Sequence, residues 1–140
     1  MKQDAIIKKT TLDDNSVLIK KFIKGIEGGR TLYVADYTED VIPCGTIIAS
    51  KQVVLSEGAS AEKVYFPLAI ETAEDGTKSY KALGTDEKYE GLLYSSILTE
   101  KPAAAIMTWG IVNEEALPCA VPTAFKTALA HIDYQTDEEA

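Results

Sequence analysis

The sequence predicts a small, mainly β domain with one short C-terminal helix and an extended N-terminal arm. Short apolar segments with strand-like alternation recur along the chain, and loops rich in Gly, Pro and charged residues separate them. One segment near the C-terminus has the apolar spacing of a helix. A chain of 140 residues has the usual size of one domain and can bury a core. We therefore expect an arm over residues 1–15, a β-barrel-like or β-sandwich-like domain over residues 16–132, and an acidic tail over residues 133–140.

The segment from Glu90 to Leu117 gives the clearest prediction of a strand pair. Its apolar residues predict strands at Leu92–Leu98 and Ala103–Val112, with a turn at Pro102, which has no N–H for a sheet. Alternation places four side chains of the second strand on one face: Ala104, Ile106, Thr108 and Gly110. The opposite face carries Ala105, Met107, Trp109 and Ile111. Alanines are poor strand formers, so they suit a place where another backbone or a large side chain comes close.

Three further strands are expected in the N-terminal half. Ser16–Ile26 fits either a helix or a strand, since a helical face would contain Leu18, Phe22 and Ile26. Its β-branched and aromatic residues and Gly25 favour the strand. Arg30–Tyr37 alternates as a strand does, and Thr46–Ala49 forms a short strand that Lys51–Leu55 can continue.

The C-terminal half adds a hairpin and the helix. Lys63–Ile70 predicts a strand, and Pro67 within it predicts an edge position or a bulge. Asp75 and Gly76 are a strong hairpin-turn signal, after which Lys78–Leu83 forms a short strand. Pro122–Ile132 predicts a helix whose apolar stripe consists of Phe125, Leu129 and Ile132.

Charge is distributed unevenly along the chain. The net charge is −8, yet the first 30 residues hold seven basic and four acidic side chains. The acidic remainder argues against nucleic acid as a partner, because phosphate contacts need clustered Lys and Arg. The basic arm fits docking on an acidic protein surface as well as it fits a solvated chain end.

The cysteines and the hydropathy indicate a soluble protein that is made in the cytoplasm and not secreted. Cys44 and Cys119 lie in apolar surroundings without a CxxC motif, which favours small buried thiols in a reducing compartment. No apolar run approaches the roughly 20 residues of a membrane span. The N-terminal segment lacks the apolar region of a signal peptide.

No catalytic, cofactor-binding or metal-binding residues are predicted. Ser95 or Ser96 with His131 and Asp133 lacks a nucleophile-elbow sequence, and a His at a helix C-terminus is ordinary. Two acidic groups do not match a Ca²⁺ loop: Asp86, Glu87 and Glu90, and Asp36, Glu39 and Asp40. The glycines form neither a phosphate loop nor a dinucleotide fingerprint. Trp109 fits a core position best, with a subunit interface as the alternative.

Four segments resemble, in the same order, those of the lambda-type phage head decoration proteins. Val41–Ala49, VIPCGTIIA, is similar to that family's I-P-x-G-T-V-I/L-A element. Tyr65–Leu68 follows with the family's aromatic-Pro-Leu character, and Gly91–Leu93 with its G-I-L character. Ala103–Val112 is similar to its small-residue strand. The N-terminal region through Gly29, the helix and the acidic tail depart from the pattern, which leaves the arm and the oligomer geometry open.

The resemblance implies a non-enzymatic protein that stabilises a mature capsid. Such proteins are small β-rich domains that sit as homotrimers on the exterior of the virion head and need no cofactor. Their N-terminal arm contacts the major capsid protein, a mode that would suit residues 2–11 as an added strand. The expected interface residues are Lys2, Ile6, Ile7, Lys8, Lys9, Ala104 and Trp109. A head-fibre base or adhesion module is the main alternative, and a small ligand-binding domain or hydrolase is a more distant one.

Overall fold

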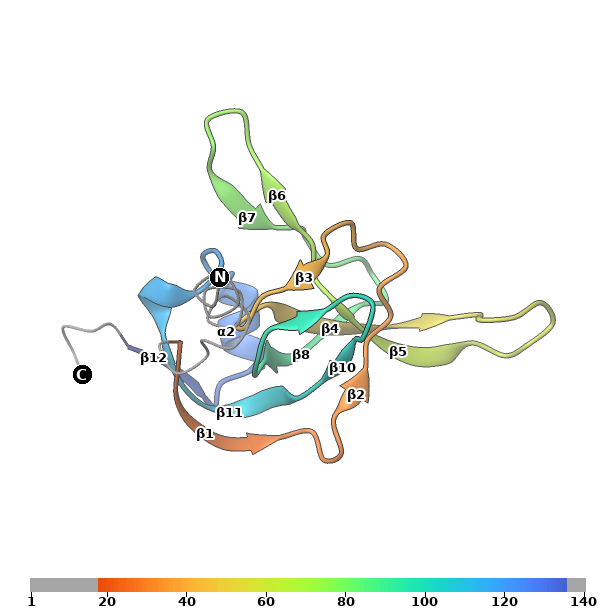
Figure 1. Cartoon of the computed structure of the whole chain (residues 1–140), viewed down its shortest axis with the longest axis horizontal. Helices are drawn as coiled ribbons and strands as arrows, with labels where there is room; N and C mark the ends of the chain where they lie inside the picture. The colour runs from red at the N-terminus through yellow and green to blue at the C-terminus, as the bar shows by residue number, and fades with distance from the viewer. Residues whose placement is uncertain (1–17, 136–140) are drawn as a thin grey trace, which may run out of the picture.

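The computed structural model describes residues 18–135 and has one large sheet at its centre (Figure 1). The strand order in this sheet is β1-β11-β8-β4-β5, and β12 lies beside β11. The strands are β1 (Ile19–Gly25), β4 (Ile47–Val53), β5 (Glu62–Pro67), β8 (Lys88–Leu93), β11 (Ile106–Asn113) and β12 (Ile132–Gln135). All neighbours are antiparallel except β11 and β12, which are parallel. Within these residues β1 and β5 do not pair with each other, so the sheet is not a closed barrel.

Three two-stranded sheets and one short helix complete the mainly β fold. The small sheets pair β2 (Arg30–Thr31) with β10 (Ala103–Ala104), β3 (Val41–Ile42) with β9 (Ile97–Leu98), and β6 (Ile70–Thr72) with β7 (Lys78–Tyr80). A 3₁₀ turn, η1 (Glu114–Ala116), precedes helix α2 (Thr123–Ala128). The predicted class, mainly β with one short helix near the C-terminus, is confirmed.

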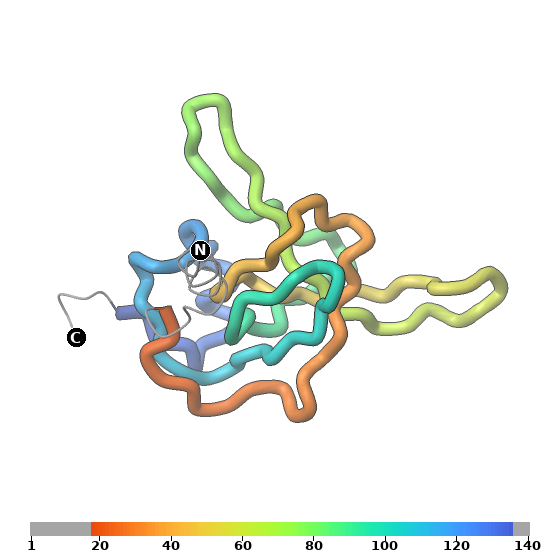
Figure 2. Tube along the Cα trace, in the orientation of Figure 1, coloured from red at the N-terminus to blue at the C-terminus, as the bar shows by residue number. Residues whose placement is uncertain are grey.

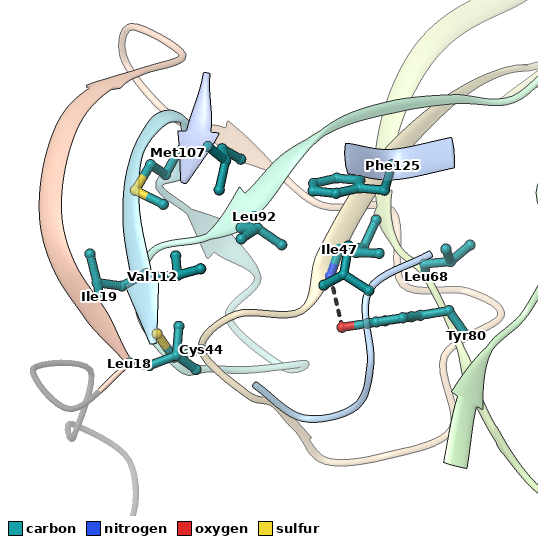
Figure 3. Close-up of a cluster of buried hydrophobic side chains, with 12 residues drawn as sticks. Leu18, Ile19, Cys44, Ile47, Leu68, Tyr80, Leu92, Met107, Val112 and Phe125 are labelled. Atoms are coloured by element: carbon teal, nitrogen blue, oxygen red, sulfur yellow. Dashed lines mark hydrogen bonds between the residues drawn. The ribbon is translucent and has the colours of Figure 1, made fainter. Parts of the chain in front are cut away.

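The central sheet is buried on both faces because consecutive strand residues point to opposite sides. Ile47, Leu92 and Met107 belong to a first core cluster with Phe125 of α2 and Tyr80 of β7 (Figure 3). Their sequence neighbours point into a second cluster, which contains Leu32, Ile42, Ile48, Leu93, Ala104 and Ile106. Two buried faces explain why these strands have continuous apolar runs instead of a simple polar alternation.

Several predicted elements are confirmed. The ambiguous N-terminal segment forms a strand, β1, and the two predicted runs after Thr46 form one continuous strand, β4. Pro67 ends β5, an edge strand of the large sheet. Asp75 and Gly76 form the β6–β7 turn, where Gly76 has a φ of 89° and the Asp75 carboxylate accepts a hydrogen bond from the Thr77 N–H.

Several predicted strands are wrong in extent. Lys63–Ile70 is a strand only to Pro67, Lys78–Leu83 only to Tyr80, and Ala103–Val112 divides into β10 and β11. Arg30–Tyr37 forms a strand only at Arg30–Thr31; Leu32 makes a single bridge to Tyr65, and the chain then turns at Val34–Tyr37. Leu92–Leu98 divides between β8 and β9, since the chain leaves the large sheet after Leu93 and β9 pairs with β3. A connection containing β9 and β10 therefore replaces the predicted turn between the two strands.

The predicted C-terminal helix is shorter than expected. Helix α2 ends at Ala128, with Pro122 in the N-cap position. Phe125 and Ile132 are both buried, but Ile132 reaches the core from β12, which pairs with β11 from Gly110 to Asn113. Strand β12 also extends the ordered sheet into residues 133–135, which were expected to belong to the acidic tail.

Candidate interaction surface

Strand β1 forms an edge of the large sheet and exposes large apolar side chains. Phe22 and Ile23 are each 42% exposed, and Trp109, which lies opposite Lys24 on β11, is 44% exposed. We call Lys21, Phe22, Ile23, Lys24 and Trp109 the β1 surface. Among the described strands β1 pairs only with β11, so β1 is an edge strand of this sheet.

The pairing of β1 with β11 is irregular. The register shifts at three places between Ile19 and Gly25, so the side chains along β1 do not follow strict alternation between the two faces. The strands approach closely at Gly110, where a Cβ atom would meet the Lys21 carbonyl oxygen. The Phe22 ring packs edge-on against Tyr94 at a centroid distance of 4.7 Å, which holds one side of that ring.

The core position predicted for Trp109 is wrong. On the same strand Met107 is fully buried, whereas the Trp109 ring packs only partly, against the His131 ring at 5.2 Å. An exposed Trp beside an edge strand has the composition of a protein interface, where Trp is enriched. The interface alternative for Trp109 therefore stays a prediction, and the structure places the residue where a partner can reach it.

Two hairpins extend from the body of the molecule in different directions (Figure 2). The β4–β5 hairpin exposes Val54 (59%) and Leu55 (54%) just beyond the end of β4. The β6–β7 hairpin is exposed over residues 71–79 and carries no large apolar side chain there. The two hairpins therefore differ in the kind of contact that they can make.

A cleft of about 820 Å³ lies between residues 36–44 and the β6–β7 hairpin. Its lining combines the carboxylates of Asp36 and Glu39 with the Tyr37 phenol. The pKa of Tyr37 is raised, mainly because the phenol is partly buried and to a smaller degree because Glu39 is nearby. Leu18, the first described residue, also lines the cleft. The mixed lining fits polar contacts and contains no nucleophile–base pair.

The structure gives the candidate catalytic residues Ser96, His131 and Asp133 different partners. The Ser96 hydroxyl accepts a hydrogen bond from the Cys44 N–H at 2.9 Å, and Ser96 lines the cleft. His131 instead packs on Trp109, and the Asp133 carboxylate accepts a hydrogen bond from Gln135. No contact among residues 18–135 brings Ser96 together with either of them.

The two cysteine thiols lie in apolar surroundings, as predicted from the sequence. Cys44 is buried in the first core cluster and donates from its thiol to the Tyr94 carbonyl oxygen. Cys119 is partly buried against the same cluster, and burial raises the pKa of its thiol.

The remaining predicted interface residues are distributed between the core and the undescribed segment. Ala104 is 5% exposed and belongs to the second core cluster, so its small side chain serves packing within this chain. It lies opposite Arg30, and a Cβ atom on Gly29 would meet its carbonyl oxygen, which is the close approach expected of the alanines. The arm residues Lys2, Ile6, Ile7, Lys8 and Lys9 lie outside the described residues.

The described residues contain neither a metal-binding cluster nor a helix that could span a membrane. No group of three or more His, Cys, Asp and Glu side chains between residues 18 and 135 is arranged to hold a metal ion. In that same part of the chain, no helix has the length and apolar character to cross a membrane. Comparison with protein-family models, curated proteins and solved structures finds no match to this chain.

Proposed function

We propose that the chain is a capsid-decorating protein of the lambda type, which binds the major capsid protein on the exterior of a mature phage head as a homotrimer. The observation that carries this proposal is the position of the four segments that resemble that family. They contribute to β4, β5, β8 and β11, which are the consecutive strands β11-β8-β4-β5 of the large sheet. Segments that are short in the sequence thus belong to one structural unit, as a shared fold requires.

The distribution of exposed side chains supports a role in protein contacts. The described residues expose apolar side chains on an edge strand and on a projecting hairpin, where other protein chains can reach them. A decorating protein needs such contacts with its own copies and with the shell. The residues that line the cleft include no nucleophile paired with a base, so the exposed apolar surfaces favour protein contacts over covalent chemistry in the cleft.

The arm completes the proposal. Residues 1–15 combine the apolar pair Ile6-Ile7 with Lys2, Lys8 and Lys9, a composition that suits an added strand on an acidic protein surface. The major capsid protein would supply the sheet edge, and the arm would tether each copy to the shell. Interface residues on the body would join the copies.

Co-sedimentation with expanded, undecorated heads of its own phage tests the proposal, with procapsids as the control. We expect saturable binding to expanded heads, and loss of that binding when residues 1–15 are deleted. A variant that lacks residues 136–140 is the matched control and should bind as the full chain does. Undiminished binding without the arm would remove the arm from the mechanism. A trimer that binds neither shell would favour a head-fibre base or another structural module.

A further inference from the structure

The exposed large hydrophobic side chains of residues 18–135 fall into two groups. Phe22, Ile23 and Trp109 belong to the β1 surface, and Val54 and Leu55 belong to the β4–β5 hairpin. We call residues 54–62 the hairpin tip. In Figure 1 this tip projects to the far right, whereas β1 runs along the lower left of the body. One chain therefore cannot cover its own β1 surface with its own hairpin tip.

The two groups also have opposite charge. Strand β1 carries Lys20, Lys21 and Lys24 and no acidic residue. The hairpin tip carries Glu57 and Glu62 and no basic residue. Each group thus joins exposed apolar side chains to charges of one sign, and the signs of the two groups are complementary. Complementary charges give a contact its orientation and partner choice, while apolar burial supplies most of its affinity.

The backbone of β1 adds a further reason for this partner. An exposed edge strand with large apolar side chains invites pairing with another chain unless something covers it. Phe22 and Ile23 are adjacent in sequence and both exposed, so an extended segment beside β1 would contact side chains on either side of the strand. The hairpin tip continues the paired strands β4 and β5 and turns at residues 56–59, where the Ala59 N–H donates to the Ser56 carbonyl oxygen.

We propose that the hairpin tip of one copy docks on the β1 surface of a second copy. The contact joins two different regions of the same chain, so it is heterologous, and repetition of the contact generates a closed ring when the rotation between copies permits. This inference rests on the proposed homotrimer and deepens it, because it assigns the contact that joins one subunit to the next.

The β6–β7 hairpin provides an internal control. It also projects from the body and carries Glu71, Glu74 and Asp75, but its exposed residues include no large apolar side chain. If acidic charge on a projecting hairpin were sufficient for assembly, both hairpins would contribute. The proposed contact requires apolar and acidic groups together and so involves only the β4–β5 hairpin.

Light scattering coupled to size exclusion measures the contact directly. We expect the wild-type chain to have about three times the 15.2 kDa mass of one chain. The double substitution Val54→Asp and Leu55→Asp should reduce this mass about threefold. The charge-reversing substitutions Glu71→Lys and Glu74→Lys on the control hairpin should leave this mass unchanged. Circular dichroism of each variant verifies that the fold is retained.

Charge reversal makes the test specific for the two surfaces. Lys21→Glu with Lys24→Glu should weaken assembly, and so should Glu57→Lys with Glu62→Lys. A single chain that carries all four reversals should recover the trimer, because in every contact the reversed β1 surface of one copy then meets the reversed tip of the next. Lack of recovery, or a wild-type mass equal to that of one chain, would overturn the proposed contact.

Binding to heads separates this inference from the proposed function. A wild-type monomer that still binds expanded heads would leave the decorating role standing and would end the hairpin contact. A ring that the hairpin contact holds together but that binds no shell would support the contact between copies and contradict the decorating role. A hairpin variant that stays trimeric yet loses binding to heads would place the tip on the capsid protein and overturn the contact between copies.

Discussion

The centre and the edge of the large sheet use similar residues in opposite ways. In β4 the adjacent residues Ile47 and Ile48 are both fully buried, one in each core cluster. In β1 the adjacent residues Phe22 and Ile23 both remain substantially exposed. The difference lies in what covers each strand, because β4 has neighbours on both edges and β1 pairs only with β11 among the described strands. Central residues should therefore determine the stability of the fold, and edge residues its contacts with other chains.

The largest expected effect is the loss of a central aromatic side chain. Phe125 is fully buried and packs edge-on against Tyr89. Phe125→Ala should lower the free energy of unfolding by about 3–5 kcal/mol, the usual cost of such a cavity. Phe22→Ala, at the exposed edge, should cost about 1 kcal/mol through its contact with Tyr94. Urea denaturation of both variants measures the difference, and equal losses would remove the distinction between centre and edge.

A smaller effect is expected where β1 meets β11. A Cβ atom on Gly110 would meet the Lys21 carbonyl oxygen and the Met107 sulfur, so Gly110→Ala should destabilise by about 1–3 kcal/mol through overpacking. Gly84→Ala is the matched control, because the nearest atom to its Cβ would be the Glu87 carboxyl carbon at 3.4 Å, on a flexible side chain. Thermal unfolding should separate the two variants, and a stable Gly110→Ala would mean that β1 moves outward without cost.

Two tyrosine hydroxyls in the protein differ in their hydrogen bonding, which allows a second comparison of stability. The Tyr80 hydroxyl accepts from the Ile47 N–H at 3.2 Å, so Tyr80→Phe should cost about 1–3 kcal/mol by leaving a buried donor without that partner (Figure 3). The Tyr134 hydroxyl is buried without a hydrogen-bond partner among the described residues. Tyr134→Phe should therefore be neutral or stabilising in the same denaturation experiment. A loss for Tyr134→Phe as large as that for Tyr80→Phe would contradict this assignment.

The smallest effect is a decline of stability in mild alkali. Burial raises the pKa of Tyr80 and of Tyr134, and for Tyr134 the nearby Glu114 raises it further. An unfolded tyrosine ionises near pH 10, whereas these two keep their protons when folded. The folded state thus binds more protons above about pH 10, and the free energy of unfolding falls from there as pH rises. Denaturation at pH 9, 10 and 11 should show the onset of this fall, and Tyr134→Phe should reduce the slope of the free energy of unfolding against pH.

Local sequence signals sufficed for elements whose structure depends on local chemistry. The Asp75-Gly76 turn requires a residue with positive φ, and Gly76 provides it. Pro67 marks an edge because it lacks a ladder donor, and it ends the edge strand β5. The apolar run from Thr46 into β4 reflects a strand buried on both faces.

Elements that depend on distant partners were not predictable in this way. Ile132 has the spacing of a helix stripe with Phe125, yet it pairs with Gly110 in a parallel ladder that no local pattern reveals. The exposure of Trp109 could not be read from strand alternation, because the register with β1 shifts between Trp109 and Met107 and the two residues need not share a face. Of the β1 surface only Trp109 was predicted, and the hairpin tip was not, although the acidic residues of the tip and the lysines of β1 are visible in the sequence.

The pairing of β1 with β11 has a consequence for synthesis of the chain. Ile19 lies opposite Val112, so β1 is synthesised long before its partner strand β11. Until β11 leaves the ribosome, Phe22 and Ile23 have no sheet to join, and closure of so long a loop slows folding. We expect the lysines beside them to keep neighbouring nascent chains apart during this interval, because charged side chains on an edge strand oppose aggregation. The same lysines would thus protect the chain before it folds and select its partner afterwards.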